Sequence, residues 1–414
     1  MFDAFSTALS ALNADSTAIN IVGNNLANLN TTGFKAEDVQ FSDLMSQQLG
    51  ISASSAVGTG VSPAQAVREF TQGSIQQTNG PLDAAIDGSG FFMVKDTAGE
   101  ALYTRAGNFT LGADGTLLTA NGDKVQGWNA TAGVLNLNGA AGNITIPVNA
   151  VNPASATANA SLSANLDASA VVGAPGATFS APMQVVDSQG GIHTLSFTFT
   201  KTAVNAWSYT VTIPSADLKS GGTTQIATGS LAFDGTGQLT TPASTAAPIA
   251  LKITGLADGA SDMNINWNLY NGTQGTITQF AQSSGVASTN QDGVQAGQIV
   301  KVAMSNNGVI LASYSNGQQS AVAQLAVAGI QNPDTMVSVG NNNLMATAQT
   351  AAPAVGTADS GGRGKIEGGS LETSTVDIAT EFTNLISFQR SYEAASKTIT
   401  TVDQMTQDLI SLKQ

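Results

Sequence analysis

The sequence predicts a fold of mostly β domains carried on an α-helical stem, with the stem made from the two ends of the chain. Three observations support this fold class. Apolar residues repeat on a seven-residue period at both ends, the middle is rich in Asn-Gly and Asp-Gly pairs, and those pairs are absent from both ends. Seven-residue periods indicate coiled-coil helices, and the Gly pairs indicate β-hairpins. We expect the β domains to be nested and discontinuous.

The first helix is predicted from about Asp3 to Leu29. Its apolar residues are spaced three and four apart, which places them on one helical stripe. They are Phe2 and Leu9 on one line and Phe5, Leu12, Ile19 and Leu26 on the next. Several Asn residues and Gly23 interrupt this segment and weaken it as a helix, so it depends on packing against a partner. Gly33 is the expected left-handed cap beyond its end.

The last segment repeats this pattern, and its helix is predicted to begin near Ser374 as the N-cap, with Asp377 three residues on. Its stripe consists of Ile378, Leu385, Tyr392 and Ile399 beside Phe388, Ala395, Val402 and Leu409. We expect the two stripes to form an assembly surface that is buried between helices of different copies. An intramolecular core of two helices within one monomer is the open alternative.

Between the helices the sequence predicts two β regions. Residues 193–200 and 207–213 alternate with period two, which is typical of half-buried strands. The crossing between the regions is rich in Ala, Ser and Asn, and at Asp292-Gly293 the pattern of the first region returns. The predicted domains are a helical stem of 1–29 plus 375–414, a linker region of 30–70 plus 361–374, a first β domain of 71–147 plus 286–360, and a second, outer β domain of 148–285.

Composition excludes several classes of function. Only 10% of residues are charged, the net charge is −14, and the Lys and Arg residues form no cluster in the sequence, which argues against binding nucleic acid. The absence of cysteine excludes disulfides and thiolate metal sites. No apolar run is long enough for membrane insertion, and no basic residue precedes Lys35, so we expect no cleaved signal peptide.

Candidate catalytic and ligand-binding residues are few. His193 is the single histidine, and we expect it at the surface or at the edge of a hairpin. A zinc site needs more His or Cys than the chain contains. Residues 88–90 read as a turn, and residues 362–366 lack the spacing and the hydroxyl of a phosphate loop. The sequence therefore predicts a protein that is not an enzyme and that has no cofactor, metal or catalytic site.

Four blocks of sequence resemble the signatures of bacterial flagellar rod and hook proteins. They are residues 24–35, residues 71–73 with 82–92, residues 103–109 with 121–122, and residues 369–377 with 382–386 and 389–393. These blocks appear in the family's order and cover roughly the first 125 and the last 50 residues. The insertion at about 146–285 resembles the outer domain of the hook branch and is too large for the shorter rod proteins.

The resemblance implies a structural subunit that polymerises into the flagellar hook. That assembly is a curved hollow tube, which acts as a universal joint between motor rod and filament and transmits torque. The implied partners are copies of the chain itself, the rod, hook cap and hook-filament junction proteins, and the flagellar type III export apparatus. The implied location is extracellular, in the hook. The alternatives are a distal rod protein of the same family, a secreted β-rich adhesin and a β-rich enzyme.

Overall fold

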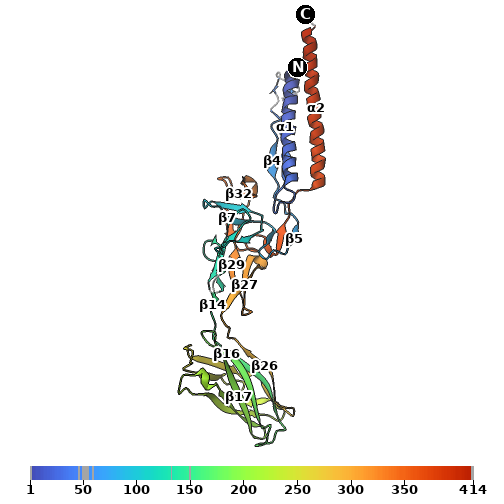
Figure 1. The fold of residues 1–414 in the computed structure, drawn as a ribbon. Helices are drawn as coiled ribbons and strands as arrows, with labels where there is room; N and C mark the ends of the chain where they lie inside the picture. The colour runs from blue at the N-terminus through green and yellow to red at the C-terminus, as the bar shows by residue number, and fades with distance from the viewer. Residues whose placement is uncertain are drawn as a thin grey trace. The chain divides into compact units, whose positions relative to one another are not determined.

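The computed structural model describes residues 2–44, 47–48, 56–57, 60–131, 133–148 and 151–411. In this part of the chain the fold is mostly β with a helix at each end, which confirms the coarse prediction (Figure 1). None of the helices that are described is long and apolar enough to cross a membrane. Contacts divide the chain into two units, described separately here. Unit 1 is Met1–Val148, Lys301–Ala312 and Gln319–Gln414, and unit 2 is Asn149–Val300 and Ser313–Gln318.

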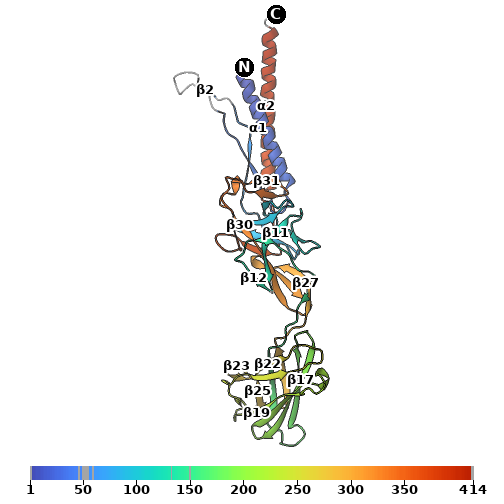
Figure 2. The same cartoon turned by 90° about the vertical axis from the view of Figure 1, so that its left-hand side faces the viewer.

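The helices of unit 1 are α1, Phe2–Ala27, and α2, Ile378–Ser411. They lie side by side and antiparallel, with both chain ends at the same end of the pair (Figures 1 and 2). The N-cap of α2 is Asp377, whose Oδ1 accepts the Thr380 N–H at 2.7 Å. The hydrogen bonds from Thr380 lower the pKa of Asp377. The prediction of Ser374 as cap is wrong, because the following residue, Thr375, is held outside the helix and donates its N–H to Phe34 O at 3.1 Å.

Gly33 has the left-handed backbone that was predicted, with φ +66°, but it does not cap α1. The helix ends at Ala27, and the Asn28 side chain donates to Asn24 O at 2.9 Å. A Cβ on Gly33 would lie 2.6 Å from the backbone carbon of Arg105. Glycine is therefore needed here for a close approach of two backbones as well as for its φ.

The sheet of unit 1 interleaves strands from the two halves of the chain. Its central order is β27-β28-β29-β11-β7-β8-β32-β31, in which β11 lies between β29 and β7. Smaller pairings repeat this theme, since β5 pairs with β35 and β6 with β34. The segment that was predicted as a linker contains the antiparallel pair β1 and β4. One core cluster in this unit comprises Phe91, Tyr103, Ala328, Met336 and Leu344.

The strands of unit 1, with β27 and β28 continuing into unit 2, have the following bounds. They are β1 Glu37–Gln40, β2 Gln47–Gln48, β3 Ala56–Val57, β4 Gln65–Arg68, β5 Ile75–Gln77, β6 Ala84–Asp87, β7 Phe91–Lys95, β8 Ala101–Thr104, β9 Thr110–Leu111, β10 Leu117–Leu118, β11 Lys124–Thr131, β12 Val134–Leu135, β13 Gly142–Asn143, β27 Gly297–Met304, β28 Val309–Tyr314, β29 Gln319–Leu325, β30 Val327–Gly329, β31 Val337–Gly340, β32 Asn343–Met345, β33 Ala354–Gly356, β34 Lys365–Gly368 and β35 Ser370–Glu372.

Unit 2 contains two sheets that share one core. The first has the order β16-β17-β18-β19-β20, and the second has the order β21-β22-β15-β25 with β26 paired to β15. The strands are β14 Val151–Asn152, β15 Asn159–Asp167, β16 Thr178–Val186, β17 Ile192–Ala203, β18 Ala206–Thr212, β19 Gln225–Phe233, β20 Leu239–Thr241, β21 Ile249–Ile253, β22 Met263–Asn268, β23 Tyr270–Asn271, β24 Gln274–Gly275, β25 Ile277–Phe280 and β26 Gly285–Gln291.

Period-two alternation forms this core, as the sequence predicts. Along β17 every second residue is buried, and on β18 Trp207, Tyr209 and Val211 point inward. Trp267 of the second sheet meets Phe197 of the first, with ring centroids 4.8 Å apart in an edge-to-face arrangement. The Trp207 indole N–H donates to Gln279 Oε1 at 3.0 Å, so this buried donor is satisfied.

His193 was predicted at the surface or at the edge of a hairpin. It lies at the end of the β16–β17 hairpin, where it pairs with Val185, but it is not at the surface, because only 6% of the residue is exposed. The same alternation explains its position. His193 has the same parity along β17 as Leu195, Phe197 and Phe199, so it occupies the buried face near the start of the strand.

Replacing Phe197 by Ala should destabilise unit 2 by about 3–5 kcal/mol, because a fully buried aromatic side chain is lost. Urea unfolding followed by tryptophan fluorescence reports this unit, since two of the three tryptophans, Trp207 and Trp267, lie in it. The control is Val204→Ala, at a position that is 85% exposed. Equal midpoints for the two variants would contradict the shared core.

Candidate functional site

The helix pair carries the residues that the sequence predicts as an assembly stripe, and the structure places them in two groups. Those that are half-buried are Leu12, Ile19, Leu26, Leu385, Phe388, Ile399 and Val402. Those that are exposed are Phe5, Ile378 and Tyr392. The side chain of Leu409 lies outside the described residues. Phe388 also meets Phe41, with ring centroids 5.9 Å apart, so α2 packs against the segment after β1 as well as against α1.

The buried face of α1 is made of smaller residues than the predicted stripe. Ala14, Ala18 and Val22 are spaced four apart and are almost fully buried, and Ile21 is beside them. Residues at this spacing lie on one helix face. Sequence reasoning followed the large apolar residues and missed these alanines, whose small side chains let neighbouring backbones approach closely.

Helix α2 exposes a line of apolar residues that the stripe did not fully include. Ile378, Phe382 and Ile386 are four residues apart, and they are 46%, 51% and 50% exposed. They form a continuous row, because positions i, i+4 and i+8 are neighbours on a helix surface. Met405 and Ile410, nearer the C-terminus, are exposed as well. We call Ile378, Phe382 and Ile386 the outer row of α2.

At the base of the helix pair, Asn25 joins three segments. Its side-chain amide donates to Glu37 O at 2.8 Å and accepts the Glu37 N–H at 3.0 Å, and it also donates to Glu381 Oε1 at 2.8 Å. Asn25 is 1% exposed. The Asn residues of this segment are predicted from the sequence to be weak helix positions. The structure shows that this one is a buried connector between α1, β1 and α2.

Glu381 is the buried acid of this connection. Burial raises its pKa, the hydrogen bond from Asn25 opposes that rise, and the charges of Asp38 and Asp377 add to it. Its Oε2 is buried without a hydrogen-bond partner. A buried and partly unsatisfied carboxylate favours its protonated form.

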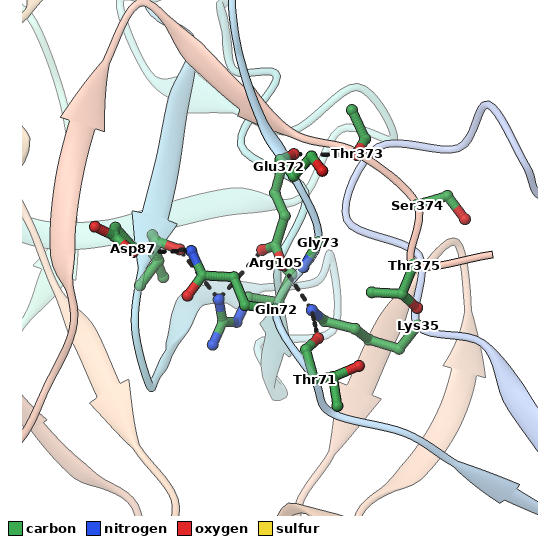
Figure 3. Close-up of polar contacts among 12 residues, drawn as sticks. Lys35, Thr71, Gln72, Gly73, Asp87, Arg105, Glu372, Thr373, Ser374 and Thr375 are labelled. Atoms are coloured by element: carbon green, nitrogen blue, oxygen red, sulfur yellow. Dashed lines mark hydrogen bonds and ion pairs between the residues drawn. The ribbon is translucent and has the colours of Figure 1, made fainter. Parts of the chain in front are cut away.

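A second buried centre lies where the N- and C-terminal segments meet, and Figure 3 shows it around Glu372. Glu372 is fully buried at the end of β35. Its Oε1 lies 2.6 Å from Lys35 Nζ and accepts the Gly73 N–H at 2.8 Å, while its Oε2 lies 3.2 Å from a guanidinium nitrogen of Arg105. We call Lys35, Arg105 and Glu372 the buried triad.

Backbone carbonyls also accept hydrogen bonds from the two cations, although Arg105 Nε is buried without a partner. Lys35 Nζ donates to Thr71 O at 2.5 Å, and Arg105 donates to Ile86 O at 3.2 Å and to Gly88 O at 2.8 Å. Burial lowers the pKa of Lys35, and the hydrogen bond and charge of Glu372 offset part of that effect. Burial lowers the pKa of Arg105 as well, and Glu372 again opposes it. The carboxylate therefore favours the charged form of both buried cations, against the effect of burial.

The buried triad brings together the four blocks that carry the family resemblance. Lys35 ends the first block, Gly73 and Ile86 belong to the second, Arg105 to the third and Glu372 to the fourth. Two further hydrogen bonds join the segment after α1 to the segment before α2. Gly33 donates its N–H to Glu372 O at 2.8 Å, and Ala36 donates its N–H to Thr375 Oγ1 at 2.8 Å. The contribution of the triad was not visible in the sequence, since its members are far apart along the chain.

Family profiles match the chain in four places. They are the flagella basal body rod protein over residues 5–35, the flagellar hook protein FlgE/F/G D1 domain over 85–159, the flagellar basal body protein FlaE D2 domain over 165–294, and the flagellar basal body rod FlgEFG protein C-terminal over 367–412.

Curated relatives match along their whole length. The flagellar hook protein FlgE of Salmonella typhimurium is 32% identical, with 99% of this chain and 100% of that protein covered. The chain belongs to the flagellar hook protein family. The Escherichia coli hook protein is 34% identical, with 99% of this chain and 100% of that protein covered, and the Borreliella burgdorferi hook protein is 32% identical, with 98% of each covered. Hook proteins are structural subunits and not enzymes, as the sequence predicts.

A solved structure of a Helicobacter pylori hook protein, FlgE2, is similar with a TM-score of 0.49 at 14% identity. The similarity covers 70% of this chain and 99% of that one.

Replacing Glu372 by Gln should destabilise unit 1 by about 3–5 kcal/mol, because two buried cations lose their counter-charge. The destabilisation of a double variant that also carries Lys35→Met should be smaller than that of Glu372→Gln alone, since one of the two unpaired buried charges is then absent. Urea unfolding measured by far-UV circular dichroism gives the coupling energy. Glu367→Gln, at a half-buried position on β34, serves as the control. Additive effects of the Glu372 and Lys35 changes would contradict the triad.

Replacing Glu381 by Gln should raise thermal stability at neutral pH. The folded-state pKa of Glu381 lies above its ordinary value, so the folded chain holds this proton more tightly than the unfolded chain. Burying the ionised Glu381 carboxylate lowers the stability of the folded chain. This loss of stability is complete above the pKa of Glu381 in the folded chain, and it disappears as pH falls below the pKa in the unfolded chain, about 4.3. The difference in melting temperature from the native chain should therefore shrink toward about pH 4. Glu393→Gln, exposed on α2, should show no such trend.

Proposed function

We propose that this protein polymerises through its helix pair into the flagellar hook, a curved hollow tube that transmits torque between motor rod and filament. The observation that carries the proposal is the outer row of α2, an apolar surface on a helix whose other face is already occupied. Half of each of its side chains remains exposed. A row of this kind on a monomer is typical of a surface that another chain covers.

The energetics suit repeated assembly. Complete burial of a large apolar side chain contributes about 1.5–3 kcal/mol, so covering the exposed half of each residue in the outer row adds roughly 1 kcal/mol. Each subunit in a polymer makes such a contact, so small gains accumulate along the tube. Low charge also helps, because only 10% of residues are charged and few like charges oppose packing between copies.

In this proposal the two helices form a coiled-coil stem that lines the inner tube. The seven half-buried stripe residues, which include Leu12 and Val402, pack within the stem. The exposed stripe residues Phe5, Ile378 and Tyr392 join the outer row in contacts with other copies. The β part of unit 1 forms a middle shell, and unit 2 is a nested outer domain inserted into it. The buried triad holds the chain ends together where the stem begins.

The proposed partners are other copies of the chain, the rod, the hook cap, the hook-filament junction proteins and the type III export apparatus. We propose export without cleavage of a signal peptide and an extracellular location in the hook. Matches to hook proteins over the whole chain favour the hook over a distal rod protein. The terminal helix pair favours assembly over a secreted β-rich adhesin, whose function would not need it.

Replacing Ile386 by Asp should abolish tube formation and leave the melting temperature of the monomer almost unchanged. The side chain is half exposed in the monomer, so a carboxylate there is solvated, but in the tube it would be buried without a partner. The measurement pairs thermal melting of the monomer with electron microscopy of protein in precipitating salt.

The control is Ser387→Asp, which introduces the same charge at the neighbouring exposed position of α2. Tubes should form with this variant. If both variants assemble, or if both fail alike, the outer row is not the specific contact and the proposal is overturned.

A further inference from the structure

Unit 2 contains a cluster of titratable side chains that the assembly function does not use. His193 Nε2 lies 2.9 Å from Asp187 Oδ2 and 3.5 Å from Asp258 Oδ2. These three atoms all lie within 4.8 Å of one another. Ligands about 2.0–2.2 Å from one metal ion are separated by roughly 3 Å, so the observed spacings match the edges of a coordination shell.

Each carboxylate has one oxygen fixed by the backbone and the other directed at the imidazole. Asp187 Oδ1 accepts the N–H groups of Gln189 and Gly191 at 2.7 and 2.9 Å, and Asp258 Oδ1 accepts the N–H of Ala260 at 2.9 Å. The Oδ2 atoms are therefore held facing His193 Nε2, and a metal ion would replace the hydrogen bond that Asp187 Oδ2 makes with it.

The other ring nitrogen of His193 faces a third carboxylate. Nδ1 is buried without a satisfied hydrogen bond, and Asp217 Oδ2 lies 3.3 Å from it. Histidines that bind metals commonly place a carboxylate behind the ring, where it orients the imidazole and makes it more basic. Asp217 occupies that position here.

Space and charge also favour a cation. A Cβ on Gly191 would lie 2.5 Å from Asp187 Oδ2 and 3.3 Å from Asp258 Oδ2, so only glycine leaves this side of the cluster open. Three carboxylates surround one imidazole, and even a protonated ring leaves negative charge in excess within the cluster. Asp258 has 37% of its side chain exposed, which gives an ion a path from solvent.

We propose that Asp187, His193 and Asp258 bind a divalent first-row transition-metal ion, with Asp217 as the residue that orients the histidine. The expectation of no zinc site counted His and Cys alone, whereas Asp and Glu oxygens also bind zinc. One imidazole and two carboxylates suit zinc and its neighbours better than calcium or magnesium, which prefer all-oxygen shells. Water would complete the shell on the exposed side of Asp258.

The ion would fasten the two sheets of unit 2 together at one end. Asp187 follows β16 and His193 lies in β17, both in the first sheet, whereas Asp258 lies between β21 and β22 of the second. A direct bond already links these loops, because Ser261 donates its N–H to Ser188 Oγ at 3.0 Å. Metal binding would add a stronger link between them without needing a disulfide.

The single histidine makes the test direct. Imidazole resonances of full-length monomer labelled with ¹⁵N-histidine should shift on adding Zn²⁺ and saturate at one ion per chain, with Nε2 as the ligated atom. Mass spectrometry under native conditions checks the stoichiometry. Calcium at the same concentration should leave these resonances in place, and tighter binding of calcium than of zinc would overturn the assignment to a transition metal.

Variants separate this site from binding at other acidic groups. Asp258→Asn should weaken Zn²⁺ affinity at least tenfold, as should His193→Gln, and Asp217→Asn should weaken it about 10–100-fold. The matched control is Asp234→Asn, a carboxylate in another turn of unit 2 that accepts the Thr236 and Gln238 N–H groups. Because Asp258 is partly exposed, its variant should fold normally. If Asp258→Asn binds Zn²⁺ as tightly as the control, or if the imidazole resonances do not move, the proposal is wrong.

Discussion

The fully buried carboxylate of Glu372 is the interaction on which the rest of unit 1 depends. It balances Lys35 and Arg105, which are 3% and 6% exposed, in a region where an unpaired charge would cost several kcal/mol. Because Lys35 follows the first helix and Glu372 precedes the last, one carboxylate holds the two ends of the chain in register. The strand pairs β5–β35 and β6–β34 extend the same connection.

Asn25 and Glu381 repeat this arrangement closer to the helices. An amide, rather than an ion, joins α1, β1 and the first turn of α2, and Glu381 is held beside it with its pKa raised by burial. The two centres together explain why a chain with so few charges buries several of them. In these two centres each buried charge lies where segments from opposite ends of the sequence meet, and there a directional contact specifies one arrangement better than apolar packing does.

Different interactions stabilise the two units. Unit 2 relies on an apolar sandwich with Phe197, Trp207 and Trp267 at its centre, and its polar cluster around His193 lies at one end, near the start of β17. Unit 1 combines smaller apolar clusters with interleaved strands and the buried triad. The helix pair adds little large apolar burial of its own on α1, where alanines dominate the buried face. The large apolar residues of the outer row of α2 stay exposed.

Elements that depend on local pattern could be predicted from the sequence alone. Seven-residue periods located both helices, period-two alternation located β17 and β18, and Asp-Gly turns located hairpins such as β9–β10. Short motifs also identified the family, which the matches to hook proteins confirm. Local pattern failed where a role comes from long-range contact. It did not reveal that His193, at the edge of a hairpin, is buried, it took Ser374 for the cap of α2, and it read Asn25 as a weak helix position.

Only the tertiary structure decided which polar residues meet. Lys35, Gly73, Arg105 and Glu372 are separated by up to 337 residues, and no periodicity connects them. The same holds for Asp187 and Asp258, which approach His193 from different sheets. The physical reason is that helix and strand propensities act over a few residues, whereas the pairing of a buried charge depends on every segment that packs around it.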